Sequence, residues 1–163
     1  MTTLATDPLT LIHTAISLLA ILTGLPVLAA MMKGQTPVTL TGVFLALTVL
    51  TSVTGYFFHN EHVTPAMIVG AISLFLLAVA LFAFYGQHLA GRWRTAYVIT
   101  ATMALYLNVF VLVIQSFIKI PPLHALAPGI PPAGPVFGAV QGVVLIGFAV
   151  AGWKAVKAGR VNP

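Results

Sequence analysis

Residues 106–117 read YLNVFVLVIQSF, which is apolar at almost every position but carries two amides, at Asn108 and Gln115. About two turns of α-helix separate the two amides, so they point to the same side of the helix. A polar side chain on a helix that dissolves in lipid needs a hydrogen-bonding partner. The stretch therefore predicts a membrane helix with one polar side, whose partners are other helices or a bound group.

The composition of the whole chain also indicates a membrane protein. Of its 163 residues, 60% are hydrophobic and 6% are charged, whereas a soluble domain carries about 25% charged residues. A soluble protein of this length could not hide so much apolar surface, so we expect an all-α integral membrane bundle in a single domain, residues 1–163. The chain has no Cys, which excludes disulfides and thiolate metal sites.

Five apolar stretches are long enough to cross a bilayer, at roughly 8–32, 38–58, 65–87, 95–118 and 136–157. At ~1.5 Å per residue, each covers a hydrocarbon core of about 30 Å. Thr6-Asp7-Pro8 and Thr64-Pro65 are typical helix starts, with a capping side chain followed by Pro. The connection 119–135 contains six Pro and must lie outside the lipid, as a stiff connector or as a lid that presents His124.

The charged residues sort to the two sides that five spans define. The positive-inside rule makes the side richer in Lys and Arg cytoplasmic, which puts the N-terminus outside and the C-terminus inside. The net charge of +5 is a topology signal of this kind, and the chain has no basic cluster with interleaved aromatics, so we expect lipid and not nucleic acid as a partner. The inner group is Lys33, Arg92, Arg94, Lys154, Lys157 and Arg160, and the outer group is Asp7, Glu61 and Lys119.

Polar side chains concentrate in the outer half of the predicted spans, which predicts a polar pocket there. Four of them come from helices and are candidates to bind a cofactor: His13, Asn108, Gln115 and Gln141. Three histidines on the outer side are candidates to hold a metal: His59, His62 and His124. Neutral imidazole is a common metal ligand and an axial ligand of haem iron.

Three functional hypotheses follow from these residues. The first is structural: the amides hydrogen-bond between helices, and the protein is an accessory component of a membrane assembly or a homo-oligomer. The second is a redox or metal protein that binds haem b, a quinone or a divalent metal. The third, transport, ranks last because no acidic residue lies within a predicted span. With two acids in the chain, hydrolysis by a Ser, His and acid triad is poorly supported, and whether the protein is an enzyme is left open.

The last predicted span is rich in glycine, with Gly138, Gly142, Gly147 and Gly152. Small residues let the backbones of two membrane helices approach closely. The interpretation we favour is that these glycines make contacts within the bundle, and the alternative is a seam between two copies.

Two stretches carry a resemblance to known proteins. TSVTGY at 51–56 and ALYLNVFVLVIQSF at 104–117, followed by Lys119 and Pro121, resemble a family of small, functionally uncharacterised inner-membrane proteins of bacteria. The resemblance implies a helical protein of the bacterial inner membrane, and it assigns no catalytic role to any residue of this chain, so the catalytic residues stay unknown. In architecture alone, a small bundle with histidines on its outer side is also similar to haem b proteins of the cytochrome b561 type.

Overall fold

The structure is a computed structural model and describes residues 7–58 and 62–161. The regular elements of these residues are all helices, as predicted, and five helical stretches are long and apolar enough to cross a membrane, which indicates a multi-pass membrane protein. The elements are α1 (Pro8–Met31), α2 (Val38–Thr54) with the 3-10 turn η1 (Gly55–Phe57), α3 (Pro65–Leu81) with the π-helical turn η2 (Phe82–Gly86), α4 (Arg92–Lys119), the short α5 (Pro121–Leu126) and α6 (Pro135–Val161).

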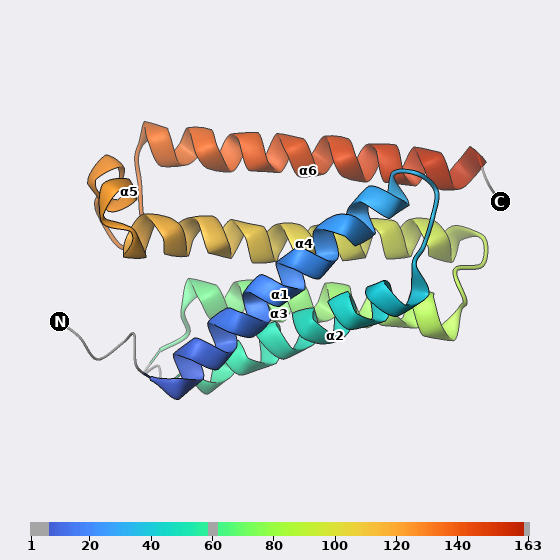
Figure 1. The fold of residues 1–163 in the computed structure, drawn as a ribbon, viewed down its shortest axis with the longest axis horizontal. Coiled ribbons are helices and arrows are strands. Elements are labelled where there is room, and N and C mark those ends of the chain that lie inside the picture. Colours follow the sequence, from blue (N-terminus) through green and yellow to red (C-terminus); the bar gives the residue numbers. More distant parts are fainter. Residues whose placement is uncertain (1–6, 59–61, 162–163) are drawn as a thin grey trace.

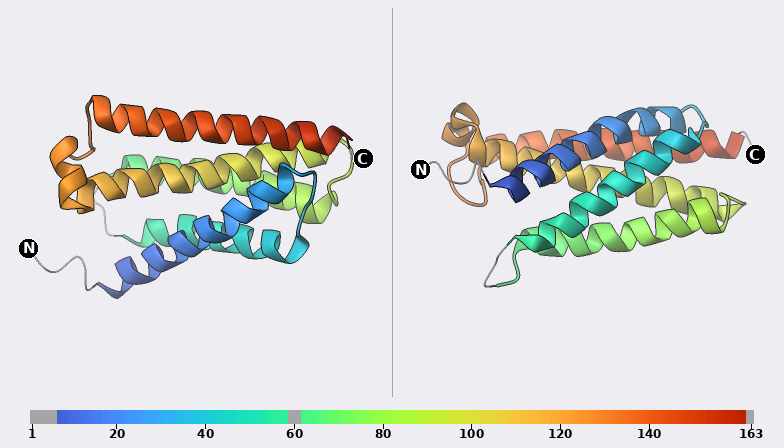
Figure 2. Two further views of the ribbon diagram at one scale, coloured as in Figure 1. Left: turned by 45° about the horizontal axis from the view of Figure 1, so that its top comes forward. Right: turned by 60° about the horizontal axis from the view of Figure 1, so that its bottom comes forward.

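The long helices run up and down between two ends of the molecule (Figure 1). We call them the Asp7 end, where α1, α3 and α6 begin, and the Arg94 end, where α2 and α4 begin. α1 packs along α2 and α3 along α4, while α6 lies beside α4 and also contacts α1 (Figure 2). Because α1 crosses the bundle obliquely, its first turns lie away from α4 at the Asp7 end.

Two of the helices begin as the sequence predicts. Asp7 accepts a hydrogen bond from the backbone N–H of Thr10 at 3.2 Å, and Pro8 follows as the first residue of α1. Thr64 caps α3 in the same way, with its hydroxyl 3.3 Å from the N–H of Met67. These caps satisfy N–H groups that have no partner within the helix.

Three predicted boundaries differ from the structure. α4 begins at Arg92 and not at 95, because Gly91 takes a φ of 52° that turns the chain into the helix three residues earlier. The connection 119–135 contains the helix α5, whose first residues, Pro121 and Pro122, need no N–H partner there. α6 continues to Val161, past the predicted end at 157.

The core lies among α1, α2, α3 and α4. Phe44, Leu45, Leu77, Tyr97 and Leu105 are each at most 1% exposed and come from α2, α3 and α4. α1 can approach them because it has a glycine at position 24, where an added Cβ would lie 2.6 Å from Leu105 and 2.8 Å from Phe44. α6 adds Ala155 to this core and is otherwise a peripheral helix.

The favoured interpretation of the α6 glycines is wrong for three of the four. A Cβ added at Gly138, Gly142 or Gly147 would meet nothing within 4 Å, whereas one at Gly152 would lie 3.3 Å from Thr102 of α4. The reason is that α6 contacts the bundle through larger side chains, including Phe148, which packs against Tyr106 at 5.7 Å between ring centroids.

Candidate functional site

His13 joins α1 to the end of α2 near the Asp7 end. Its Nδ1 lies 2.8 Å from the Thr54 hydroxyl oxygen. That hydroxyl donates its own hydrogen to the carbonyl oxygen of Leu50 at 2.7 Å, so it can only accept from the imidazole. Nδ1 therefore carries the hydrogen, and the neutral ring has an unprotonated Nε2 with a free lone pair.

The His13 ring is half-buried, and η1 and the residue after it hold it in place. Phe58 packs edge-on against it, with ring centroids 5.2 Å apart and an interplanar angle of 88°. On another side, a Cβ added at Gly55 would be in ordinary contact with the ring, 3.7 Å from its Cε1. The imidazole thus has one fixed nitrogen and one available nitrogen.

Polar side chains of α2 continue into the interior of the bundle. The Ser52 hydroxyl lies 3.1 Å from that of Ser73 in α3 and 3.0 Å from the carbonyl oxygen of Thr48, so this pair is satisfied. The hydroxyl oxygen of Thr51 is buried and has no hydrogen-bond partner. Thr51 lies six residues before the end of η1, which is a depth of about 9 Å.

Asn108 lies on α4, and its side chain is half-buried. Its amide nitrogen is buried and has no hydrogen-bond partner. It is one turn after Leu105, which packs against α1 at Gly24, and it lies on the Asp7 side of the middle of α4. The predicted inward orientation of this amide is thus what the structure shows.

Gln115 does not share this environment. It is two turns further along the same side of α4, but its side chain is exposed. The difference arises because α1 runs obliquely and has moved away from α4 at this level (Figures 1 and 2). The helical spacing of Asn108 and Gln115 predicts that both amides point to the same side of α4. It does not predict that α1 and α4 move apart along their length.

Gln141 is buried on another side of α4. Its amide nitrogen donates to the carbonyl oxygen of Phe110 at 3.1 Å, while its amide oxygen is buried without a partner. The α4 residue that packs on α6 nearby is Tyr106, and Asn108 lies about 200° further around the helix. Gln141 therefore fastens α6 to α4 and does not join Asn108.

The predicted metal set is only partly described. His62 is exposed, and His124 is half-buried with its Nδ1 3.2 Å from the carbonyl oxygen of Phe117, which ties α5 to the end of α4. His59 lies outside the described residues. Within residues 7–58 and 62–161 no group of three or more His, Asp or Glu side chains is placed to hold a metal ion. The set of three histidines stays a prediction.

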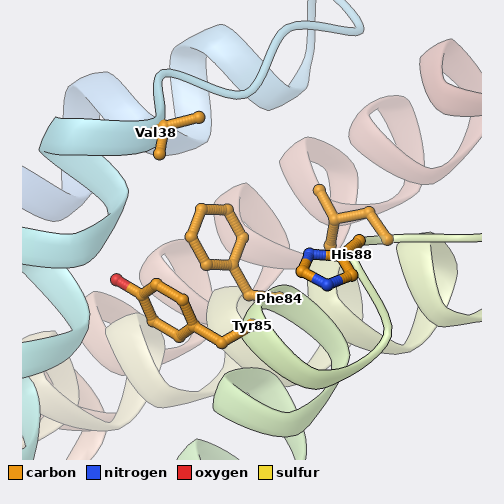
Figure 3. A pocket seen from close by; sticks show the side chains of 5 residues that line it. Val38, Phe84, Tyr85 and His88 are labelled. Atoms are coloured by element: carbon orange, nitrogen blue, oxygen red, sulfur yellow. The ribbon is translucent and has the colours of Figure 1, made fainter.

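A pocket that the sequence does not reveal lies at the Arg94 end. It has a volume of about 240 Å³ and is lined by Val38, Phe84, Tyr85, His88 and Leu89. Figure 3 shows Val38 at the start of α2 facing the Phe84 ring, with the His88 ring beside it. The backbone here is unusual, because the π-helical η2 is followed by left-handed φ angles of 49° at His88 and 59° at Leu89. Such conformations cannot be read from hydropathy patterns.

Comparisons with known proteins add no assignment, since no protein family, curated protein or solved structure matches this chain.

Proposed function

We propose that this chain is a small accessory protein of a bacterial inner membrane that binds a ligand in the outer half of its bundle. The five apolar helices support the membrane location. The concentration of Lys and Arg at the Arg94 end supports a cytoplasmic position for that end and an outside position for the Asp7 end. His13, Thr51 and Asn108 all lie in the half toward the Asp7 end.

The observation that carries the binding proposal is the amide nitrogen of Asn108, buried without a partner. A buried polar group left without a hydrogen bond costs about 1–3 kcal/mol. A ligand oxygen placed against this amide would remove that cost. The Thr51 hydroxyl is a second buried group without a partner, and it lies on α2, the helix whose Thr54 bonds to His13 of α1.

These groups fit a ligand that is apolar overall and carries carbonyl or hydroxyl oxygens. A quinone headgroup has this chemistry and partitions into lipid. A carbonyl oxygen of the quinone would accept a hydrogen bond from the Asn108 amide.

Haem b is a second candidate, and His13 is the observation that favours it. In metal-binding histidines one ring nitrogen usually donates to a fixed acceptor while the other ligates the metal. His13 has this arrangement, with Nδ1 on Thr54 and a free Nε2. Material that binds haem b would be red with a strong Soret band, and His13→Ala would remove the colour.

The quinone proposal is tested by titrating purified protein with a short-chain quinone and following thermal unfolding. Asn108→Leu removes the buried donor, while Gln115→Leu makes the same chemical change at an exposed site on the same helix. We expect the quinone to stabilise the wild type and Gln115→Leu but not Asn108→Leu. Equal stabilisation of all three proteins, or none of the wild type, would contradict the proposal.

The accessory role is supported by α6. Gly138 and Gly142, one turn apart on the same side of α6, leave open space beside a membrane helix, and such glycines are suited to close packing against a further helix. We expect Gly142→Leu to weaken co-purification of a partner subunit or a second copy without unfolding the protein. Gly152→Leu is the contrasting variant, because position 152 contacts Thr102 and a larger side chain there should disturb the fold itself. An unchanged assembly in Gly142→Leu would count against this role.

A further inference from the structure

The Arg94 end carries a concentration of positive charge that the described residues do not balance. Asp7, the acidic residue that the structure describes, caps α1 at the opposite end. No carboxylate within residues 7–58 and 62–161 is therefore available to pair with these cations. The described basic residues at this end are Lys33, Arg92, Arg94, Lys154 and Lys157.

Arg94 differs from the other cations because it turns into the protein. Its side chain is half-buried, whereas Lys33, Arg92, Lys154 and Lys157 are exposed. Its Nη2 donates to the carbonyl oxygen of Gly34 at 2.7 Å, and its Nε is buried with no hydrogen-bond partner. A Cβ added at Gly159 of α6 would overlap this Nε. The guanidinium group therefore lies between the α1–α2 connection, the first turn of α4 and the end of α6.

A guanidinium in this position has most of its hydrogen-bonding capacity unused. Arginine offers five N–H donors, and the structure pairs one of them with a neutral carbonyl. A partly buried charge with no counter-charge is unfavourable unless an anion approaches it. The planar fork of Arg matches a phosphate group, which can accept two of its hydrogen bonds at once.

The surroundings of Arg94 also favour an anion. α2 and α4 both begin at this end, and neither has a side-chain cap on its first N–H groups. The positive ends of both helix dipoles thus add to the field of the basic side chains. Trp93, next to Arg94 in the sequence and 36% exposed, is typical of the headgroup region of a bilayer.

We propose that Arg94 binds the phosphate of an anionic phospholipid, seated between the α1–α2 connection, the start of α4 and the end of α6. The phosphodiester of an anionic lipid, whose charge no choline group offsets, supplies the missing negative charge at headgroup depth and accepts hydrogen bonds from the unused guanidinium N–H groups. Lys33, next to Gly34 in the sequence, adds long-range attraction. The site is independent of the ligand proposed for the opposite half of the bundle.

Native mass spectrometry of the detergent-purified full chain tests this site. Phosphatidylglycerol and phosphatidylcholine are added separately to the wild type, Arg94→Gln and Arg92→Gln. The two variants remove the same charge at the same end, but Arg92 is exposed. We expect Arg94→Gln to lower the affinity for phosphatidylglycerol about tenfold, because it removes a charge-assisted hydrogen bond. We expect Arg92→Gln to lower this affinity less than about twofold. An equal loss in both variants would show diffuse attraction and overturn the site.

A second measurement needs only the wild-type protein and so does not depend on whether a variant folds. We expect the thermal unfolding temperature to rise with phosphatidylglycerol and to stay unchanged with phosphatidylcholine or with inorganic phosphate at the same concentration. An equal rise with inorganic phosphate would overturn the lipid as the source of the phosphate. No rise with phosphatidylglycerol would overturn the site itself.

Discussion

At the scale of single residues, the polar groups of the Asp7 half fall into two kinds. His13 has a partner in Thr54, and Ser52 has one in Ser73. The Asn108 amide nitrogen and the Thr51 hydroxyl are buried without one. The first kind fastens helices together, and the second kind is where a ligand can add hydrogen bonds.

The His13–Thr54 bond should contribute measurably to stability. Thr54→Val removes the acceptor of the imidazole while keeping the shape of the side chain. We expect a loss of about 0.5–1.5 kcal/mol, the usual range for a hydrogen bond between membrane helices, measured by unfolding in detergent. Thr23→Val is the matched control, because the Thr23 hydroxyl bonds to carbonyl oxygens of its own helix, at Leu19 and Ala20. Equal losses in the two variants would mean that the interhelical bond adds nothing.

The strained backbone at His88 offers a second test at this scale. A left-handed φ costs a residue with a Cβ about 1–2 kcal/mol, and glycine avoids most of this cost. His88 has a φ of 49° and an exposed side chain, so we expect His88→Gly to be more thermostable than His88→Ala. Both variants lack the imidazole, so the comparison isolates the backbone. A less stable His88→Gly would show that this conformation is not strained.

At the scale of the elements, the bundle depends on where helices can approach each other. α1 contacts the core through Gly24, against side chains of α2 and α4. α6, by contrast, packs through aromatic side chains such as Phe137 and Phe148 and leaves three of its glycines open. A glycine in a membrane helix thus marks a close approach only where a neighbouring helix actually lies beside it.

Gly24 and Gly138 should respond in opposite ways to the addition of one methyl group. In Gly24→Ala the new Cβ would lie 2.6 Å from Leu105, and we expect a loss of about 1–3 kcal/mol from overpacking. In Gly138→Ala it would meet nothing within 4 Å, and we expect no loss, because alanine is the better helix former. Thermal unfolding of the two variants in detergent is the measurement. Similar stability in both would contradict the close contact at Gly24.

At the scale of the whole molecule, charge and hydrophobicity together predict an orientation. The five candidate spans put Pro8 and Val161 at opposite ends of the bundle, and six of the seven Lys and Arg residues belong to the Arg94 end, the exception being Lys119. Our proposals place the ligand site and the phosphate site at opposite ends of the bundle. The orientation therefore decides which site faces which compartment.

Cysteine labelling tests the orientation directly, since the natural chain has no Cys. We expect Asn60→Cys, in the connection between α2 and α3, to react with an impermeant thiol reagent added to intact cells. Gln35→Cys, in the exposed α1–α2 connection, should react only after the cells are opened. The reverse pattern would invert the topology and move the phosphate site to the outer leaflet.

The sequence by itself determined the helical class, the five spans and the starts of α1 and α3. These depend on local properties: an apolar stretch must be about as long as the bilayer is thick, and a helix start needs a cap. Hydropathy and caps act within one segment, so they can be read without knowing its neighbours.

Only the tertiary structure decided which polar residues share an environment. Gln115 lies on the same side of α4 as Asn108 but is exposed because α1 crosses obliquely, and Gln141 bonds to α4 on a different side. In the sequence, Arg94 is one of several basic residues that indicate the topology. The tertiary structure places its side chain against Gly34 and Gly159. The physical reason is that crossing angles and helix neighbours arise from packing between distant segments, which no periodicity within a single helix encodes.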